Sequence, residues 1–361
     1  MDALHDPNSE FHFLSELVLS PDSLEFSDRI ADIAGQLDVP RCDSLSKLAT
    51  KNHVVVRAFS RLKVVLGGTH SLSQWLSDSL KEEQLRIQLA LGFLNEICTI
   101  LDRHGCPAMV IKSLDHWPDL GSDLDLYTNA DPADVIAVMQ THLSAKLEPR
   151  SWGDRLANKW NFVVPDLPEL VEIHIGRLGQ TGEQTLVTKS LSGRTRTSEI
   201  EQHSFRVLAP EDRIIISTLQ RMYRHFYIRL CDVVDNAALL DSESVDFTYL
   251  RTLGREAGLW EGIATYLTII SGYVKAFRGH GVSLSAEVTD SAKFEVSNVQ
   301  FRRDFLRVPI VPQSLNLYAG ELKTLLLQGQ VRNSFRLSLL PGLATAAALE
   351  LKITGSDKGI W

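Results

Sequence analysis

The stretch VIKSLDHWPDLGSDLDLYTNAD, residues 110–131, places two carboxylates two residues apart within a strand-like pattern. Asp123 and Asp125 alternate with Leu124 and Leu126. Because successive side chains of a strand point to opposite faces, the two aspartates share one face and the two leucines share the other. Aspartate is a poor strand former, and like charges on one face repel unless a positive charge lies between them. The stretch therefore predicts a strand whose carboxylates are held together by a cation.

A third carboxylate follows the same alternation in LVEIHIG, residues 170–176. Glu172 and His174 point to one side of this predicted strand, and the apolar residues around them point to the other. If the two strands are neighbours, Glu172 joins the aspartates on one face, and such a cluster is costly without a counter-ion. Carboxylate oxygens are the ligands that Mg²⁺ prefers. We therefore expect a Mg²⁺ (or Mn²⁺) site, with His174 as either a catalytic or a structural residue.

The residues before the aspartates suit phosphate binding. Ser113 ends the apolar run AMVIKS, residues 108–113, and offers a hydroxyl and a backbone N–H to a phosphate oxygen. Lys112 adds a positive charge, which either binds phosphate or pairs with a site carboxylate. Gly121 and Ser122 permit a tight backbone turn into the aspartate strand. These four residues form the predicted phosphate-binding set.

The composition is that of a globular protein with more than one lobe. The chain has 361 residues, of which 44% are hydrophobic and 23% charged, enough for a sizeable core. Its net charge of −8 argues against a general nucleic-acid binder but leaves room for a local basic cleft. Four cysteines without a CxxC pair or zinc spacing indicate reduced thiols and a cytoplasmic location. The first residues do not resemble a signal peptide, and no run of about 20 apolar residues predicts a membrane span.

Helical patterns flank a short region of strands. Residues 80–104 show helical apolar spacing that Gly105 should end, and residues 211–240 read as one long helix. Residues 337–351 are expected to form a buried helix after a break. Between these regions the order β-β-α-β-β predicts an α/β core, with elements at residues 108–113, 122–128, 131–147, 159–166 and 170–178. The expected division is an N-terminal helical lobe at 1–105, the core at 106–208 and a C-terminal helical lobe at 209–361.

These motifs together resemble the nucleotidyltransferase superfamily that includes DNA polymerase beta. Within it, VIKSLDHWPDLGSDLDLYT, then LVEIHIG, then LAPEDRIIISTLQRMYRHFYIRLCDVVDNAALL are similar to the uncharacterised bacterial nucleotidyltransferase family. The similarity is clearest over residues 80–260. It implies an α+β fold, with a small mixed sheet between N-terminal and C-terminal helical lobes.

The resemblance also implies roles for the motif residues. Asp123, Asp125 and Glu172 match the metal-binding and catalytic acids. Ser113 stands at the phosphate-binding position, where the family more often has glycine. With Lys112, Gly121 and Ser122, it forms the expected nucleotide-binding set.

The implied activity is a Mg²⁺-dependent transfer of a nucleoside monophosphate from an NTP such as ATP to an acceptor hydroxyl, with release of pyrophosphate. A small molecule or a protein side chain is the expected acceptor, and no membrane partner is expected. Two alternatives remain open. The chain is either a catalytically silent nucleotide-binding module or a transferase that acts on RNA, although its acidic charge disfavours RNA.

Several further residues have both a functional and a structural interpretation. The predicted helix 211–240 places three polar residues on one face, where they either reach the nucleotide or form an internal ion-paired face. Two cations in WGDRLANKW either contact phosphates or lie in a solvated turn, and a tryptophan in the loop either stacks on a base or packs against helices. The three polar residues of the helix are His225, Arg229 and Asp232. The two cations are Arg155 and Lys159, and the tryptophan is Trp117.

Overall fold

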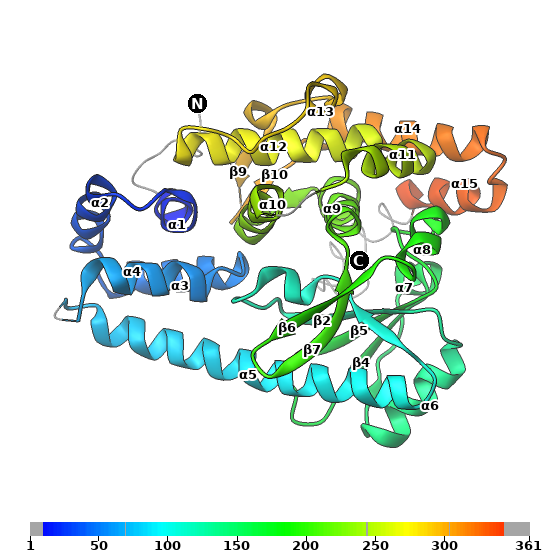
Figure 1. Ribbon diagram of the computed structural model, residues 1–361, viewed down its shortest axis with the longest axis horizontal. Coiled ribbons are helices and arrows are strands. Elements are labelled where there is room, and N and C mark those ends of the chain that lie inside the picture. Colours follow the sequence, from blue (N-terminus) through cyan, green and yellow to red (C-terminus); the bar gives the residue numbers. More distant parts are fainter. Residues whose placement is uncertain (1–9, 69, 243–244, 303, 343–361) are drawn as a thin grey trace.

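The computed structural model describes residues 10–68, 70–242, 245–302 and 304–342, and it begins with five helices (Figure 1). The predicted helix at 80–104 is confirmed and is longer than expected, because it begins at Ser73. Gly105 follows its end with φ of 76°, a conformation that favours glycine. Of the break and buried helix expected at residues 337–351, only residues 337–342 lie within the part of the chain that the structure describes. The five helices are α1 (Glu10–Leu19), α2 (Leu24–Ala34), α3 (Val39–Lys51), α4 (Val55–Leu66) and α5 (Ser73–Arg103).

A mixed sheet of seven strands follows, in the order β3-β4-β5-β2-β1-β7-β6. The pairs β2·β5 and β1·β7 are parallel and the other neighbours are antiparallel, so the predicted α+β class and mixed sheet are confirmed. The sheet is larger than predicted, because the edge strand β3 and the hairpin β6–β7 extend it. The strands are β1 (Ala108–Val110), β2 (Asp123–Thr128), β3 (Lys146–Leu147), β4 (Lys159–Val163), β5 (Leu170–Ile175), β6 (Thr195–Ile200) and β7 (His203–Leu208).

The two faces of the sheet differ in what covers them. On one face, Leu124, Leu126 and Ile173 pack with α5 and with α6 (Pro132–His142) in one hydrophobic cluster. On the other face, Met109, Ile111 and Tyr127 join a cluster with helices from the C-terminal half. Figure 1 shows the sheet between α5 and α6 on one side and the later helices on the other. The period-two alternation of β2 and β5 therefore has the predicted effect, because the carboxylates point away from the α5 side.

The later elements are mainly helical and include a second, three-stranded sheet in the order β8-β10-β9. Shorter elements of the core are η1 (Ser113–His116), α7 (Trp152–Ala157) and α8 (Thr185–Leu191). After these come α9 (Pro210–Thr218), the π-helical segment η2 (Leu219–His225), β8 (Tyr227–Ile228), α10 (Leu230–Ser242), α11 (Phe247–Ala257), α12 (Trp260–Arg278), α13 (Ala286–Ser291), η3 (Val296–Asn298), β9 (Gln300–Arg302), β10 (Phe305–Arg307), η4 (Ile310–Ser314), α14 (Leu315–Leu327) and α15 (Val331–Ser338).

The N-terminal helices do not form a lobe of their own on the far side of the sheet. Phe11, Leu14 and Phe59 belong to the same hydrophobic cluster as Ile270 and Tyr273 of α12. Ser15 also lies within hydrogen-bonding distance of the Tyr273 hydroxyl, at 2.8 Å. The prediction that the sheet lies between an N-terminal and a C-terminal lobe is therefore wrong in this respect. Helices α1–α4 and the C-terminal helices share one core, and α5 alone crosses to the opposite face.

The prediction of one helix over 211–240 is also wrong. The chain leaves the helix at Phe226, whose φ is 53°, and residues 227–228 pair with β10. The break allows the Asp232 carboxylate to accept from the backbone N–H of Arg229 at 2.7 Å and to pair with the Nε of Arg221 at 2.7 Å. Arg221 and Asp232 are both buried. This ion pair joins the two halves of the interrupted helix.

We expect Asp232→Asn to lower the free energy of unfolding by about 3 kcal/mol, because it leaves the Arg221 charge buried without its partner. Urea unfolding followed by circular dichroism measures this. The matched control is Glu287→Gln, which breaks the 2.6 Å pair with Arg251 near the surface and should change stability little. Equal effects of the two substitutions would show that the Arg221–Asp232 pair does not hold the break in place.

No helix among the residues that the structure describes has the length and hydropathy needed to cross a membrane.

Candidate metal and nucleotide site

The three predicted acids lie on one face of the sheet, on the central parallel pair β2·β5. Asp125 is the direct register partner of Glu172, and Asp123 precedes it by two residues on the same strand. A ligand atom from each of Asp125, Glu172 and His174 lies within 4.8 Å of the others. The charge of Glu172 also acts on Asp123. The shared sheet face of the three acids is therefore confirmed, whereas the reach of all three carboxylates to one ion stays a prediction.

Two lysines and the histidine already contact these acids. Lys112 Nζ forms an ion pair with Asp125 Oδ1 and lies 3.7 Å from Glu172 Oε1. On the other side of Glu172, Lys159 Nζ is 2.8 Å from Oε2, and His174 Nε2 is 2.9 Å from Oε1. Glu172 is thus held by three nitrogen groups, whereas Asp125 is held by one. The alternative in which Lys112 pairs with a site carboxylate is what the structure shows.

This asymmetry sets the protonation of the pair. Burial raises the pKa of Asp125 to about 7, opposed by Lys112 and reinforced by the Glu172 carboxylate. Burial acts on Glu172 in the same direction, but Lys112, His174 and Lys159 hold its pKa well below its usual range. Burial lowers the pKa of His174 to about 4, so the imidazole is neutral at pH 7. At neutral pH the site therefore holds an ionised Glu172 beside an Asp125 that is close to its own protonation midpoint.

Asp123 occupies the most open part of the site. It is the first residue of β2 and is only partly buried, and Ser122 Oγ lies 3.4 Å from its Oδ2. Burial and the Glu172 charge raise the pKa of Asp123, and Lys112 and Lys159 oppose this shift. A divalent cation bound there would relieve the repulsion.

Ser113 has a structural role that the sequence did not indicate. Its hydroxyl donates to the Asp123 carbonyl at 3.1 Å and accepts from the Asp125 backbone N–H at 2.7 Å. The side chain is buried and joins the start of η1 to the aspartate strand. In this structure the hydroxyl is thus used by the backbone of the aspartate strand, and its contact with a phosphate oxygen stays a prediction.

Gly121 does not have the predicted conformational role. Its φ lies outside the left-handed region, and an added Cβ would make only ordinary contacts, with no atom nearer than 3.8 Å. Its carbonyl accepts from Arg86 Nη1 at 3.3 Å. The exposed Ser122 is the one member of this pair that faces the acids.

The loop between β1 and β2 is fixed by the N-terminal helices. Arg57 of α4 donates through Nη2 to the carbonyls of His116 and Trp117, at 2.9 and 2.7 Å. The buried Asp119 carboxylate accepts from the backbone N–H of Val56 at 2.6 Å. Arg86 of α5 donates to the Leu120 carbonyl at 3.1 Å. These contacts hold the segment that follows Lys112, and hence the position of that lysine.

Two polar residues of β4 belong to the site: Asn161, which the sequence analysis did not single out, and Lys159, for which it offered a phosphate contact or a solvated turn. Lys159 and Asn161 are the register partners of His174 and Glu172, so they share the face of the acids. Lys159 is buried between Glu172 and Asp154 of α7, 2.9 Å from the latter. It is not part of a solvated turn. Residues 159–163 alternate with period two, and this alternation could have predicted that Lys159 lies on the same face as Glu172.

The remaining predicted residues lie away from the acids or have other partners. Trp117 packs against the hydrophobic cluster between the sheet and α5, as its structural interpretation predicts. The guanidinium of Arg155 lies 5.5 Å from the centre of the Trp152 ring. Asp232 belongs to an internal ion pair, with Arg221, as described above. His225 lines a cavity of about 600 Å³ on the helical side of the molecule.

Two partners of the acids, Lys112 and His174, open onto the helical side of the molecule. Lys112 and His174 line a small pocket of about 40 Å³ together with Gln180, Leu219 and Arg224. Gln180 and Arg224 also line a larger cavity of about 600 Å³. The larger cavity is mostly apolar, and its other lining residues include Tyr223, His225, Tyr227, Arg307 and Tyr318. The small pocket thus lies between the sheet and the later helices, and the opening of the acids into it stays a prediction.

No protein-family model, curated protein or solved structure matches the chain significantly. The resemblance to nucleotidyltransferases therefore rests on the sequence motifs, and function must be argued from the geometry of the site.

We expect Ser113→Ala to lower the free energy of unfolding by about 1 to 3 kcal/mol, because it leaves the buried Asp125 N–H without its acceptor. Chemical unfolding of the metal-free protein measures this. Ser122→Ala, at the exposed position beside Asp123, is the control and should change stability little. If Ser113→Ala leaves stability unchanged and only weakens nucleotide binding, the serine is a phosphate ligand after all.

His225 should make stability depend on pH. Burial, Arg224 and Arg221 lower the pKa of its imidazole well below the usual value, so the folded protein takes up this proton less readily than the unfolded chain. Stability is therefore lost as the pH falls below about 6.5, the pKa in the unfolded chain. The difference in free energy of unfolding between wild type and His225→Gln should shrink by about 1 kcal/mol from pH 7.5 to about pH 5.5. A constant difference would contradict the assignment.

Proposed function

We propose that the protein is a metal-dependent nucleotidyltransferase that moves a nucleoside monophosphate from an NTP to an acceptor hydroxyl and releases pyrophosphate. The observation that carries this proposal is the direct pairing of Asp125 with Glu172 on adjacent parallel strands, with Asp123 on the same face. Three carboxylates gathered on one sheet face beside a small pocket provide the ligands of a Mg²⁺ ion that also binds phosphate oxygens.

The donor set fits such an ion. Asp123, Asp125 and Glu172 would hold Mg²⁺ or Mn²⁺, and all three are oxygen donors. The Oδ1 of Asn161, the register partner of Glu172, is a buried oxygen with no hydrogen-bond partner. An additional ligand or water at the acids would meet an acceptor that the protein has left unsatisfied. When bound, the ion would supply positive charge that offsets the charge developing on the transferred phosphoryl group.

The surrounding side chains support binding of the triphosphate and orientation of the acids. Lys112 is placed to exchange its ion pair with Asp125 for a phosphate oxygen, and Arg224 offers a second cation at the other side of the small pocket. Lys159 and His174 hold Glu172 ionised and fix the orientation of its carboxylate. The larger cavity has room for a nucleoside or an acceptor, with the tyrosine rings as apolar contacts.

A second candidate, the catalytically silent nucleotide-binding module, is favoured by one observation. Lys112 and Lys159 already supply two positive charges to the acids, so the cluster is largely neutralised by the protein itself. In such a module, the lysines would permanently replace the metal charge, and nucleotide would bind equally well with and without Mg²⁺.

Label transfer separates the two candidates. The full chain is incubated with each α-labelled NTP, Mg²⁺ or Mn²⁺ and a host lysate, and the fraction that takes up label identifies the acceptor class. We expect Asp123→Asn and Asp125→Asn each to reduce transfer by about 100-fold or more, because each removes a charged metal ligand. Asp123→Asn should leave the metal-free protein as stable as before, or more stable by about 1 kcal/mol, because the repulsion from Glu172 is removed.

The control is Asp131→Asn. The Asp131 carboxylate accepts from the backbone N–H of Ala133 at 2.8 Å at the start of α6, away from the acids. Asparagine caps a helix about as well, so neither transfer nor stability should change much. If no label is transferred and nucleotide binds without any effect of Mg²⁺, the transferase proposal fails and the silent module is correct.

A further inference from the structure

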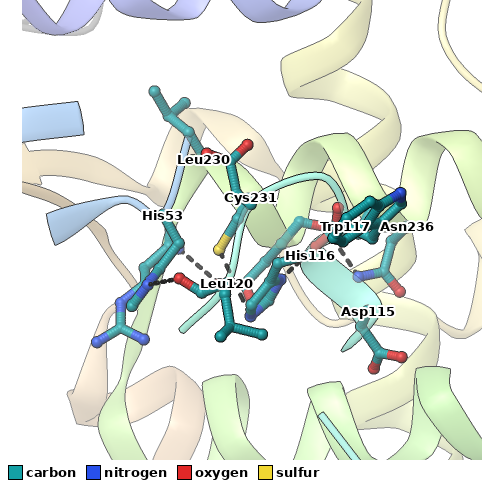
Figure 2. A network of polar contacts seen from close by, with 12 residues as sticks. His53, Asp115, His116, Trp117, Leu120, Leu230, Cys231 and Asn236 are labelled. Carbon is teal, nitrogen blue, oxygen red and sulfur yellow. Dashed lines mark hydrogen bonds and ion pairs between the residues drawn. The ribbon is translucent and has the colours of Figure 1, made fainter. Parts of the chain in front are cut away.

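A second cluster of metal-ligating side chains lies between η1 and the start of α10 (Figure 2). The Sγ of Cys231 is 3.9 Å from the Nε2 of His116, and the Nδ1 of the same imidazole is 2.5 Å from Asp235 Oδ2. Figure 2 shows the sulfur directed toward the His116 ring. Ligand atoms of these three residues lie within 4.8 Å of one another. None of the three belongs to the acid site.

The charged neighbours of this cluster are already paired. Asp235 Oδ1 is 2.6 Å from Arg57 Nη1, Asp115 pairs with Arg213 at 2.7 Å, and Asp232 pairs with Arg221. Among the residues that the structure describes, the sulfur has one hydrogen-bond contact, with His116. The thiol and the imidazole nitrogen therefore face each other within a shell of paired charges.

The sulfur–nitrogen distance fits two ligands of one ion better than it fits a hydrogen bond. A distance of 3.9 Å is long for a thiol that donates to nitrogen. Zinc bonds of about 2.3 Å to sulfur and about 2.0 Å to nitrogen, at a tetrahedral angle, place these two atoms about 3.6 Å apart. A shift of about 0.3 Å would therefore allow Cys231 and His116 to bind the same cation.

The imidazoles are oriented as metal-binding histidines usually are. Because Nδ1 of His116 lies 2.5 Å from the Asp235 carboxylate, Nε2 is the nitrogen that faces the sulfur, and a cation bound there would replace the proton between Nε2 and Sγ. The ring of His53 stacks on His116 at 5.7 Å between centroids, and its Nδ1 lies 3.3 Å from the Leu120 carbonyl oxygen. With Nδ1 donating to that carbonyl, the second nitrogen of His53 carries a free lone pair.

A hydrolytic or acyl-transfer role for Cys231, His116 and Asp235 does not fit the surroundings. Cys231 is fully buried, and burial raises the pKa of its thiol. The cavity beside His116 and Asp235 has a volume of about 10 Å³, too small for any substrate. A buried ion, in contrast, needs no substrate cleft.

We propose that Cys231 and His116 bind one zinc-type cation, with Asp235 as the residue that positions the imidazole. Binding forms a sulfur–metal bond and releases the thiol proton to solvent, so affinity should rise with pH. The ion would connect η1 directly to α10. Because η1 begins next to Lys112, the site would stabilise the segment that carries the phosphate-binding lysine.

Cobalt titration tests this proposal on the full chain. The protein is first treated with a chelator, and Co²⁺ is then added while the near-ultraviolet thiolate-to-cobalt charge-transfer band is followed. We expect one equivalent of Co²⁺ to produce the band and one equivalent of Zn²⁺ to remove it. Co²⁺ at the acid site gives no such band, because that site contains no sulfur. The band should therefore persist in Asp125→Asn.

Variants locate the ligands. Cys231→Ser and His116→Gln should each abolish the band, and Asp235→Asn should weaken Co²⁺ binding about 10- to 100-fold while keeping it. Cys98→Ser is the matched control, because Cys98 lies on α5 and packs against the hydrophobic cluster beneath the sheet, so the band should remain unchanged. If wild type shows no band, or if the band survives in Cys231→Ser, the proposal is overturned. The wild-type titration decides the matter even if a variant fails to fold.

Discussion

The parallel pairing of β2 with β5 is the constraint on which the rest of the site depends. Its register places Asp125 directly beside Glu172, so two carboxylates lie next to each other on one face of the sheet. Such a pairing is destabilising unless positive charge lies close to it. The protein supplies that charge from both flanks, with Lys112 from the end of β1 and Lys159 from β4. The cost of bringing the acids together is thus offset locally, although repulsion from Glu172 still raises the pKa of both aspartates.

The same register explains why the sheet needs different layers on its two faces. The leucines that alternate with the aspartates require an apolar partner, which α5 and α6 provide. The acid face requires polar partners and an opening, which the shared core of N-terminal and C-terminal helices leaves beside η2. The N-terminal helices also act directly on the site, because Arg57 and Arg86 hold the loop between β1 and β2 through its backbone carbonyls. Helices α4 and α5 therefore help to position the site, although the acids themselves lie on β2 and β5.

Local sequence patterns predicted those parts of the structure that depend on local periodicity. The alternation of residues 122–128 and 170–176 was sufficient to place three carboxylates on one face, and the apolar spacing of residues 80–104 was sufficient for α5. The hairpin β6–β7 was missed because it lies at the sheet edge, and β6 has only one buried residue, Ile200. The interruption at Phe226 was missed because its cause is non-local, since residues 227–228 pair with a strand about 80 positions later. A hydroxyl such as that of Ser113 looks the same in sequence whether it binds phosphate or the backbone.

The segment η1 connects the two polar centres of the molecule. Lys112 and Ser113 at one end contact the acid strand, and His116 at the other end contacts Cys231 and Asp235. His116 and Cys231 are separated by 115 residues, so their meeting could not be inferred from spacing. Because η1 is only four residues long, a displacement at His116 must be absorbed within a few backbone dihedrals before it reaches Lys112. The arginine contacts to this loop and the contacts of His116 with α10 therefore restrain the position of one ammonium group relative to the Asp125 carboxylate. The helical half of the chain thus helps to set the geometry of the Lys112–Asp125 ion pair, which in the proposed transferase would have to open for Lys112 to bind a phosphate oxygen.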